Sequence, residues 1–230
     1  MLRVEGLQAW YGESQVLRGV DLEVPAGEVV TLIGRNGMGK TTTLKCIMGI
    51  HRQKQGRILL DGREISDLPS QQVARRGIGW VQDDRGIYAS LSVLENLLLP
   101  PVVGEASWNL GEIFSVFPQL KERAAQPGGK LSGGEQKMLG IARVLRMGAR
   151  LLLMDEPTEG LAPLLARRVG EMLLEIKAHG LTVLLVEQNL RFATTVADIH
   201  YLIVNGQTVR CLSNQEVIRQ ERELLEYLGV

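Results

Sequence analysis

The segment GRNGMGKT, residues 34–41, has the residue types and spacing of a phosphate-binding loop. It fits the pattern G-x-x-x-x-G-K-[ST] and lies between an apolar run, EVVTLIG, and a helix-like run, TTTLKCIMGI. Glycines let such a loop wrap phosphate oxygens with backbone N–H groups, Lys40 adds a positive charge near the β- and γ-phosphates, and Thr41 can ligate Mg²⁺. A chance glycine-rich turn is the alternative, but the flanking strand and helix argue against it. The segment predicts that ATP or GTP binds here.

An acidic pair follows a second apolar run, LLLMDE, at residues 151–156. Asp155 is expected to reach the Mg²⁺ shell, and Glu156 to orient or deprotonate the attacking water. Alternatively the two acids only cap the next helix, which Pro157 makes possible. Together with the phosphate loop, the pair favours nucleotide hydrolysis over nucleotide storage.

A second glycine-containing turn lies in KLSGGEQKML, residues 130–139. Small residues before a helix leave backbone N–H groups open, and the positive end of the helix dipole attracts anions. A plain helix N-cap at Ser132, with Glu135 completing a capping box, explains the same letters. The residues are compatible with both interpretations.

The elements that would position these residues fall into two α/β blocks around a helical insert. The first thirty residues alternate with a period near two, which predicts short antiparallel strands. Residues 84–148 have helical spacing with proline-containing breaks. Asp61-Gly62 and Asn205-Gly206 predict hairpin turns, and residues 213–228 a charged terminal helix. This order predicts a doubly wound sheet with a helical subdomain.

Composition limits the class of protein. The 230 residues are 45% hydrophobic and 23% charged, with 26 basic and 26 acidic side chains, so no net charge favours nucleic acid or an anionic membrane as the partner. No apolar run approaches the ~18–20 residues that span a bilayer, and the first residues lack the apolar block of a signal peptide. Cys46 and Cys211 match no metal spacing. We expect a soluble cytoplasmic protein.

Three motifs in this order, GRNGMGKTT, LSGGEQ and LLLMDEPTEGL, resemble those of the ATP-binding subunit of an ABC transporter. The resemblance runs essentially end to end, and the middle motif is specific when it lies between the other two. It implies a single ABC ATPase domain over residues 1–230, with a P-loop (RecA-like) core sheet, an N-terminal antiparallel β subdomain and an inserted α-helical subdomain. Residues 1–83 and 149–230 would form the core with the β subdomain, and residues 84–148 the helical signature subdomain.

The resemblance also gives the second turn a function. Subunits of this family pair head to tail, so that the signature of one chain covers ATP held by the other. Tyr11 resembles the aromatic residue that stacks on adenine, although a core tyrosine is an alternative. The residues implied to serve the partner's ATP are Leu131, Ser132, Gly133, Gly134, Glu135 and Gln136. Those implied to bind the chain's own nucleotide are Tyr11, Gly34, Arg35, Asn36, Gly37, Met38, Gly39, Lys40, Thr41 and Thr42.

The chain departs from the family pattern at three positions. Where the family has a loop glutamine near the metal, ungapped comparison puts Asp83, with Gln82 one residue earlier as the alternative. The family's switch histidine is Gln188, which can hydrogen-bond a γ-phosphate but cannot shuttle a proton. Ala162 stands where many members have a dimer-contact aspartate. The implied metal ligands are Thr41, Asp155 and Asp83, and the implied catalytic residues are Glu156 and Gln188.

The segments VEQN, DEPTEGLAP and DDRGIYASLSVLENLLLP are similar to those of ATPases for branched-chain amino-acid uptake, in particular the shorter of the two ATPase subunits. This similarity implies ATP and Mg²⁺ as cofactors. It implies as partners a second ATPase subunit (a heterodimer, or else a homodimer), two transmembrane permease subunits and, indirectly, a periplasmic solute-binding protein, with no nucleic acid. The chain would then lie in the cytoplasm, peripheral to the inner face of the membrane. Uptake of urea or short amides, an exporter, and a soluble ABC ATPase acting on DNA or ribosomes are the alternatives.

Overall fold

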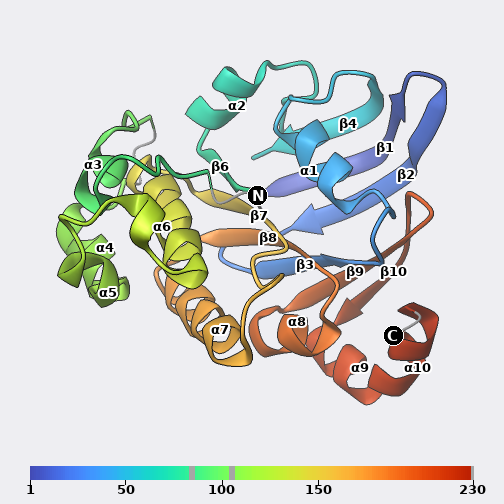
Figure 1. The fold of residues 1–230 in the computed structure, drawn as a ribbon. Coiled ribbons are helices and arrows are strands. Elements are labelled where there is room, and N and C mark those ends of the chain that lie inside the picture. Colours follow the sequence, from blue (N-terminus) through green and yellow to red (C-terminus); the bar gives the residue numbers. More distant parts are fainter. Residues whose placement is uncertain (83–85, 104–106, 229–230) are drawn as a thin grey trace.

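The computed structural model describes residues 1–82, 86–103 and 107–228, with the side chains of residues 227 and 228 excepted. Within these residues ten strands form one mixed sheet in the order β5-β4-β1-β2-β10-β9-β3-β8-β7-β6, with helices around it (Figure 1). The strands are β1 (Leu2–Tyr11), β2 (Ser14–Val24), β3 (Val29–Ile33), β4 (Lys54–Leu60), β5 (Arg63–Glu64), β6 (Ile78–Val81), β7 (Leu151–Asp155), β8 (Thr182–Glu187), β9 (Ile199–Val204) and β10 (Gln207–Ser213).

The half of the sheet that carries the predicted site is parallel. β3 pairs with β8 and β9, and β7 pairs with β6 and β8, all in parallel. Every residue of β3, β7 and β8 is buried, as expected for strands covered on both faces. The parallel strands and the helices on them confirm the predicted doubly wound core.

The other half is antiparallel, as the N-terminal alternation predicts, although β1 and β2 are long rather than short strands. Both predicted hairpin turns are present. Asp61 and Gly62 have φ of 49° and 74°, and Asn205 and Gly206 have φ of 48° and 78°. Two successive positive φ values suit a two-residue hairpin, which explains the Asp-Gly and Asn-Gly pairs. The halves join where β10 runs parallel to β2, at the pair Gln207 and Gly19.

The helices follow the predicted order, with one difference. The charged segment predicted as one terminal helix forms two, because the backbone at Gln220 leaves helical values with φ −108° and ψ 14°. The helices are α1 (Lys40–Ile47), α2 (Ser70–Arg75), α3 (Val93–Leu98), α4 (Leu110–Val116), α5 (Pro118–Glu122), the 3-10 helix η1 (Gly128–Lys130), α6 (Gly133–Arg146), α7 (Pro163–Ala178), α8 (Leu190–Val196), α9 (Asn214–Arg219) and α10 (Glu221–Leu228).

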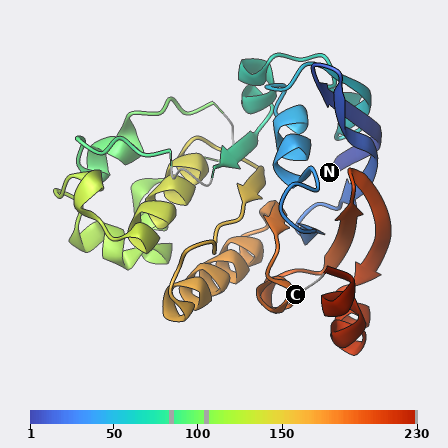
Figure 2. The same cartoon turned by 45° about the vertical axis from the view of Figure 1, so that its right-hand side comes forward.

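The helices of the insert lie to one side of the molecule, away from the antiparallel strands (Figures 1 and 2). Their core is continuous with one face of the parallel sheet: Leu97 of α3, Leu120 of α5, Leu139 of α6, Leu152 of β7 and Leu173 of α7 belong to one buried cluster. The insert is therefore packed on the same core as Leu152 of β7, the strand that ends at Asp155. The subdomain boundaries near residues 83 and 149 stay a prediction.

Candidate nucleotide-binding site

The predicted phosphate loop connects the end of β3 to the first residue of α1. Gly37 and Gly39 have φ of 80° and 99°, values that residues with a side chain rarely adopt. A Cβ on Gly34 would lie 2.6 Å from the carbonyl oxygen of Ile203, so only glycine fits there. Arg35 is exposed, as are the two residues after it. The loop thus has the backbone shape and the access that an anion cradle requires.

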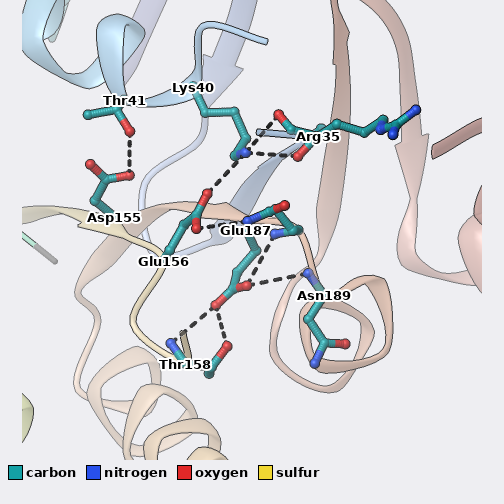
Figure 3. A network of polar contacts seen from close by, with 10 residues as sticks. Arg35, Lys40, Thr41, Asp155, Glu156, Thr158, Glu187 and Asn189 are labelled. Carbon is teal, nitrogen blue, oxygen red and sulfur yellow. Dashed lines mark hydrogen bonds and ion pairs between the residues drawn. The ribbon is translucent and has the colours of Figure 1, made fainter. Parts of the chain in front are cut away.

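Lys40 directs its ammonium group into this loop. Its side chain is 4% exposed, and Nζ donates to the carbonyl oxygens of Gly34 and Arg35 at 2.8 and 3.0 Å. Nζ also lies 3.0 Å from Oε1 of Glu156, forming a buried ion pair (Figure 3). The charge predicted for the phosphates is therefore held beside the predicted catalytic carboxylate.

Thr41 and Asp155 are brought together as predicted for metal ligands. Oγ1 of Thr41 donates to Oδ1 of Asp155 at 3.0 Å, although the two residues come from α1 and β7 (Figure 3). A hydroxyl and a carboxylate supply the oxygen ligands that Mg²⁺ prefers, and phosphate and water oxygens would complete its coordination shell. No cluster of three or more acidic, histidine or cysteine residues that could hold a metal occurs among the described residues. Asp83 lies outside the described residues, and the alternative Gln82 is exposed just after β6.

Glu156 sits in an unusual backbone conformation next to Gln188. Its φ is 44°, and such a left-handed value on a residue other than glycine costs on the order of 1–3 kcal/mol unless its surroundings hold it. Nε2 of Gln188 donates to Oε2 of Glu156 at 3.0 Å. Burial raises the pKa of the Glu156 carboxyl, but hydrogen bonds with Glu159, Lys40 and Gln188 and the charge of Lys40 outweigh burial and lower the pKa. The carboxylate is thus ionised near neutral pH, as a proton acceptor must be.

The alternative that the acidic pair caps the next helix is wrong. Helix α7 begins at Pro163, and its N-cap is Ala162. No side chain caps this helix. Ala162, which stands where many family members have aspartate, therefore leaves uncapped an N-terminus that an aspartate side chain could cap.

The second glycine-containing turn forms the start of α6. Ser132 is the N-cap in a capping box: its N–H donates to Oε2 of Glu135 at 2.8 Å, and the Glu135 N–H donates to Oγ of Ser132 at 3.4 Å. Ser132 is exposed, whereas a Cβ on Gly134 would lie 3.1 Å from the Leu165 side chain. Nε2 of Gln136 donates to the carbonyl oxygen of Leu131 at 2.9 Å and fixes the turn. The capping box is confirmed, and its N-cap residue Ser132 is exposed at the start of α6.

Tyr11 is not a core tyrosine. It ends β1, is 47% exposed, and its ring centroid lies 4.4 Å from that of His51. His51 is in turn held by a hydrogen bond between Nε2 and the carbonyl oxygen of Trp10, 2.9 Å apart.

An open hollow of about 350 Å³ lies beside the phosphate loop. It is lined by Gln15, Val16, Arg18, Gly37 and Asn205.

Sequence reasoning missed Glu187, which ends β8. It is 3% exposed, and its carboxylate accepts hydrogen bonds from Oγ1 of Thr158 at 2.7 Å and from the N–H groups of Gln188 and Asn189 at 3.2 and 3.4 Å (Figure 3). Burial raises its pKa, and these hydrogen bonds only partly oppose the rise. An acid ending an apolar strand just before Gln188 was the available signal.

Sequence reasoning also missed Lys137 of α6. The side chain is buried, and Nζ donates to the carbonyl oxygens of Glu156 and Glu159, both at 3.2 Å. The signal was a lysine three residues after Gly134 and four before Ile141, both of which are buried, so that it falls on the buried face of the helix.

The fold and the site define a P-loop α/β protein with its acidic pair in place. The family model described as ABC transporter matches residues 17–159. The chain therefore belongs to the ABC transporter family, and it is an ATPase of a transporter.

Individual relatives match over the full chain. The high-affinity branched-chain amino acid transport ATP-binding protein BraG of Pseudomonas aeruginosa is 37% identical over 100% of both chains. The lipopolysaccharide export system ATP-binding protein LptB of Haemophilus influenzae is 33% identical, over 100% of this chain and 97% of LptB. A solved ADP conformation of an ATP-binding cassette of an ABC transporter is 26% identical, with a TM-score of 0.85 over 100% of this chain and 99% of that one. No helix in the described ranges is both long and apolar enough to cross a membrane.

Proposed function

We propose that this chain binds and hydrolyses ATP to power an importer of branched-chain or other hydrophobic amino acids. The observation that carries the proposal is the 37% identity with BraG along the entire length of both chains. The assembled phosphate loop, acidic pair and switch glutamine supply the chemistry that such a subunit needs.

In this proposal the nucleotide lies along residues 34–42. The loop N–H groups and Lys40 hold the phosphates, and the exposed face of Tyr11 stacks on the adenine. Thr41 and Asp155 would hold Mg²⁺, which neutralises developing charge on the phosphates. Asp83 remains a proposed further ligand.

Glu156 acts on the attacking water. Its low pKa keeps it ionised, so it accepts a proton as the water attacks. Gln188 donates a hydrogen bond to Glu156 and keeps this carboxylate aimed. Because an amide cannot carry a proton, proton transfer rests on Glu156.

The exposed turn at Ser132 supports pairing with a second ATPase subunit, whose nucleotide the turn would contact. Two transmembrane permease subunits, with a periplasmic solute-binding protein acting on them, complete the proposed importer. The chain would then be peripheral at the inner face of the membrane. ATP closes the pair and hydrolysis releases it.

An exporter subunit is the second candidate, because LptB of Haemophilus influenzae also matches over the full chain at 33% identity. An ATPase subunit does not touch the solute, so motifs for nucleotide chemistry do not separate import from export. The membrane proteins that bind the chain distinguish an importer from an exporter.

The proposal is tested by affinity purification of this chain from detergent-solubilised native membranes, with mass identification of the proteins that co-purify. Two polytopic membrane proteins and a second ATPase are expected. Uptake of labelled leucine should fall in cells whose only copy carries Glu156→Gln. Recovery of an export complex, or uptake that is unchanged, would overturn the importer assignment.

A further inference from the structure

Lys137 connects the helix that starts with the signature turn to the loop that carries the catalytic carboxylate. It lies in the second turn of α6, four residues after Gly133. Only 4% of the residue is exposed, and its ammonium group donates at 3.2 Å to the carbonyl oxygens of Glu156 and Glu159. Burying an ammonium group is costly unless its hydrogen bonds are made. These contacts therefore define where the loop lies relative to α6.

Glu156 depends on such contacts because its backbone is left-handed, with φ 44°. Its N–H group donates to the carbonyl oxygen of Val186 at 3.0 Å, and its carbonyl accepts from Lys137. The peptide groups on both sides of Cα are thus tied, one to β8 and one to α6. Backbone conformations of this kind persist only when the surroundings determine them.

The side chain of Glu156 is aimed by this backbone. Oε1 lies 3.0 Å from Nζ of Lys40, and Oε2 accepts from Gln188 at 3.0 Å. A rotation of the Glu156 peptide would shift both oxygens. Shifts of about 1 Å in a reacting group can cost roughly 100-fold in rate.

We propose that Lys137 is a positioning residue for ATP hydrolysis, which fixes the backbone of Glu156 to helix α6 and thereby aims its carboxylate. The inference rests on the proposed role of Glu156. The contact also links the two proposed roles of the chain. The first turn of α6 would face the ATP bound by the partner subunit. The same helix, through Lys137, holds Glu156, which would act on the ATP bound by this chain.

The test is steady-state Mg-ATP hydrolysis by the full-length chain carrying Lys137→Met, which keeps the apolar stem and removes the donors. We expect kcat to fall roughly 10- to 100-fold with KM near the wild-type value. Lys137→Arg, which keeps charge and donors, should recover part of kcat. Lys121→Met, on the exposed surface of α5, is the matched control and should behave as wild type.

A double-mutant cycle separates positioning from a general structural effect. If Lys137 acts through Glu156, Lys137→Met should cause no further loss of single-turnover rate in a Glu156→Gln background. Losses that multiply would overturn the inference.

Hydrogen exchange gives a readout that does not depend on activity. Lys137→Met should speed exchange in residues 156–161 and leave α1 unchanged, and wild-type exchange would overturn the inference. If Lys137→Met does not fold, Lys137→Gln is measured in the same way, with lower kcat and faster exchange expected. A wild-type chain that binds ATP without hydrolysing it refutes the proposed function, whereas wild-type rates in the variants refute only the role of Lys137.

Discussion

Two buried glutamates beside Gln188 have pKa shifts in opposite directions, and burial and hydrogen-bond partners explain why. Hydrogen bonds and the ammonium group of Lys40 hold the pKa of Glu156 low despite burial. Burial raises the pKa of Glu187, whose partners are the hydroxyl of Thr158 and the N–H groups of Thr158, Gln188 and Asn189, all of them neutral. At Glu156 the hydrogen bonds and the Lys40 charge together exceed desolvation, whereas at Glu187 desolvation exceeds the hydrogen bonds that its carboxylate accepts. The first glutamate is therefore held ionised beside Lys40, and the second holds the loop through the hydrogen bonds that it accepts.

The low pKa of Glu156 predicts how this residue affects stability with pH. A carboxyl whose folded pKa is depressed stabilises the fold above its unfolded pKa, about 4.3, and this contribution is lost as pH falls through the folded pKa. The wild type should therefore unfold at higher temperature than Glu156→Gln at pH 7, with the difference shrinking toward pH 3–4. Thermal unfolding followed by circular dichroism measures this. A difference that grows in acid would contradict the ion pair with Lys40.

The two cysteines should differ in reactivity. Burial raises the pKa of Cys46 to about 12, against the charge of Lys54, and this residue is 1% exposed, whereas Cys211 is exposed. Since the thiolate is the nucleophile, we expect one thiol per chain to react with a disulfide reagent at pH 8 in the native protein, and two in denaturant. Rapid reaction of both thiols in the native protein would contradict the burial of Cys46.

At the scale of elements, two helix N-termini allow the signature turn to be tested against a matched control. Ser132 of α6 and Ser213 of α9 make equivalent capping boxes, with the N–H of each serine donating to its glutamate at 2.8 Å. Each serine-to-alanine change should lower the free energy of unfolding by about 1 kcal/mol. Only Ser132→Ala should also reduce ATP hydrolysis, because only α6 would face a partner's nucleotide. Equal effects of the two substitutions on ATP hydrolysis would show that Ser132 serves only as a helix cap and has no role at a partner's nucleotide.

The uncapped start of α7 predicts a stabilising substitution. Ala162 has the extended N-cap conformation, φ −61° and ψ 149°, so Ala162→Asp should raise the free energy of unfolding by about 1 kcal/mol. Ala178→Asp, at the other end of the helix, should instead lower it, since negative charge is unfavourable there. Urea denaturation compares the two. The same sign for both would contradict the capping argument.

At the scale of the whole molecule, the proposed cycle requires ATP to bring two subunits together. A ligand that swings such an equilibrium fully must favour the closed form by roughly 5.5 kcal/mol, which two nucleotides in one interface can supply. Glu156→Gln should therefore form a dimer in Mg-ATP, measured by light scattering after size exclusion. Adding Lys40→Met should abolish the dimer by preventing ATP binding. A Glu156→Gln monomer in excess ATP would contradict head-to-tail pairing of this chain with itself and leave only a heteromeric pair.

Local chemistry made much of the fold and part of the site predictable from sequence. The phosphate loop, the two hairpins and the Ser132 capping box depend on nearby residues and on glycine's freedom of φ, so their letters suffice. The buried strands β3, β7 and β8 were equally readable, because unbroken apolar runs mark strands covered on both faces. The split at Gln220 was not readable, since continuous helical spacing crosses it.

The sequence by itself determined the class of chemistry: a phosphate cradle, an acidic pair after a strand, and a glycine-containing turn at the start of a helix. Only the tertiary structure decided how these parts are joined. Lys137 and Glu187 were invisible as site residues because a charge in a helix or at a strand end becomes significant only through the groups that pack against it. Those groups, the carbonyls of Glu156 and Glu159 and the N–H of Gln188, lie on other elements or depend on loop geometry. Desolvation makes such contacts decisive, and desolvation is a property of packing rather than of residue order.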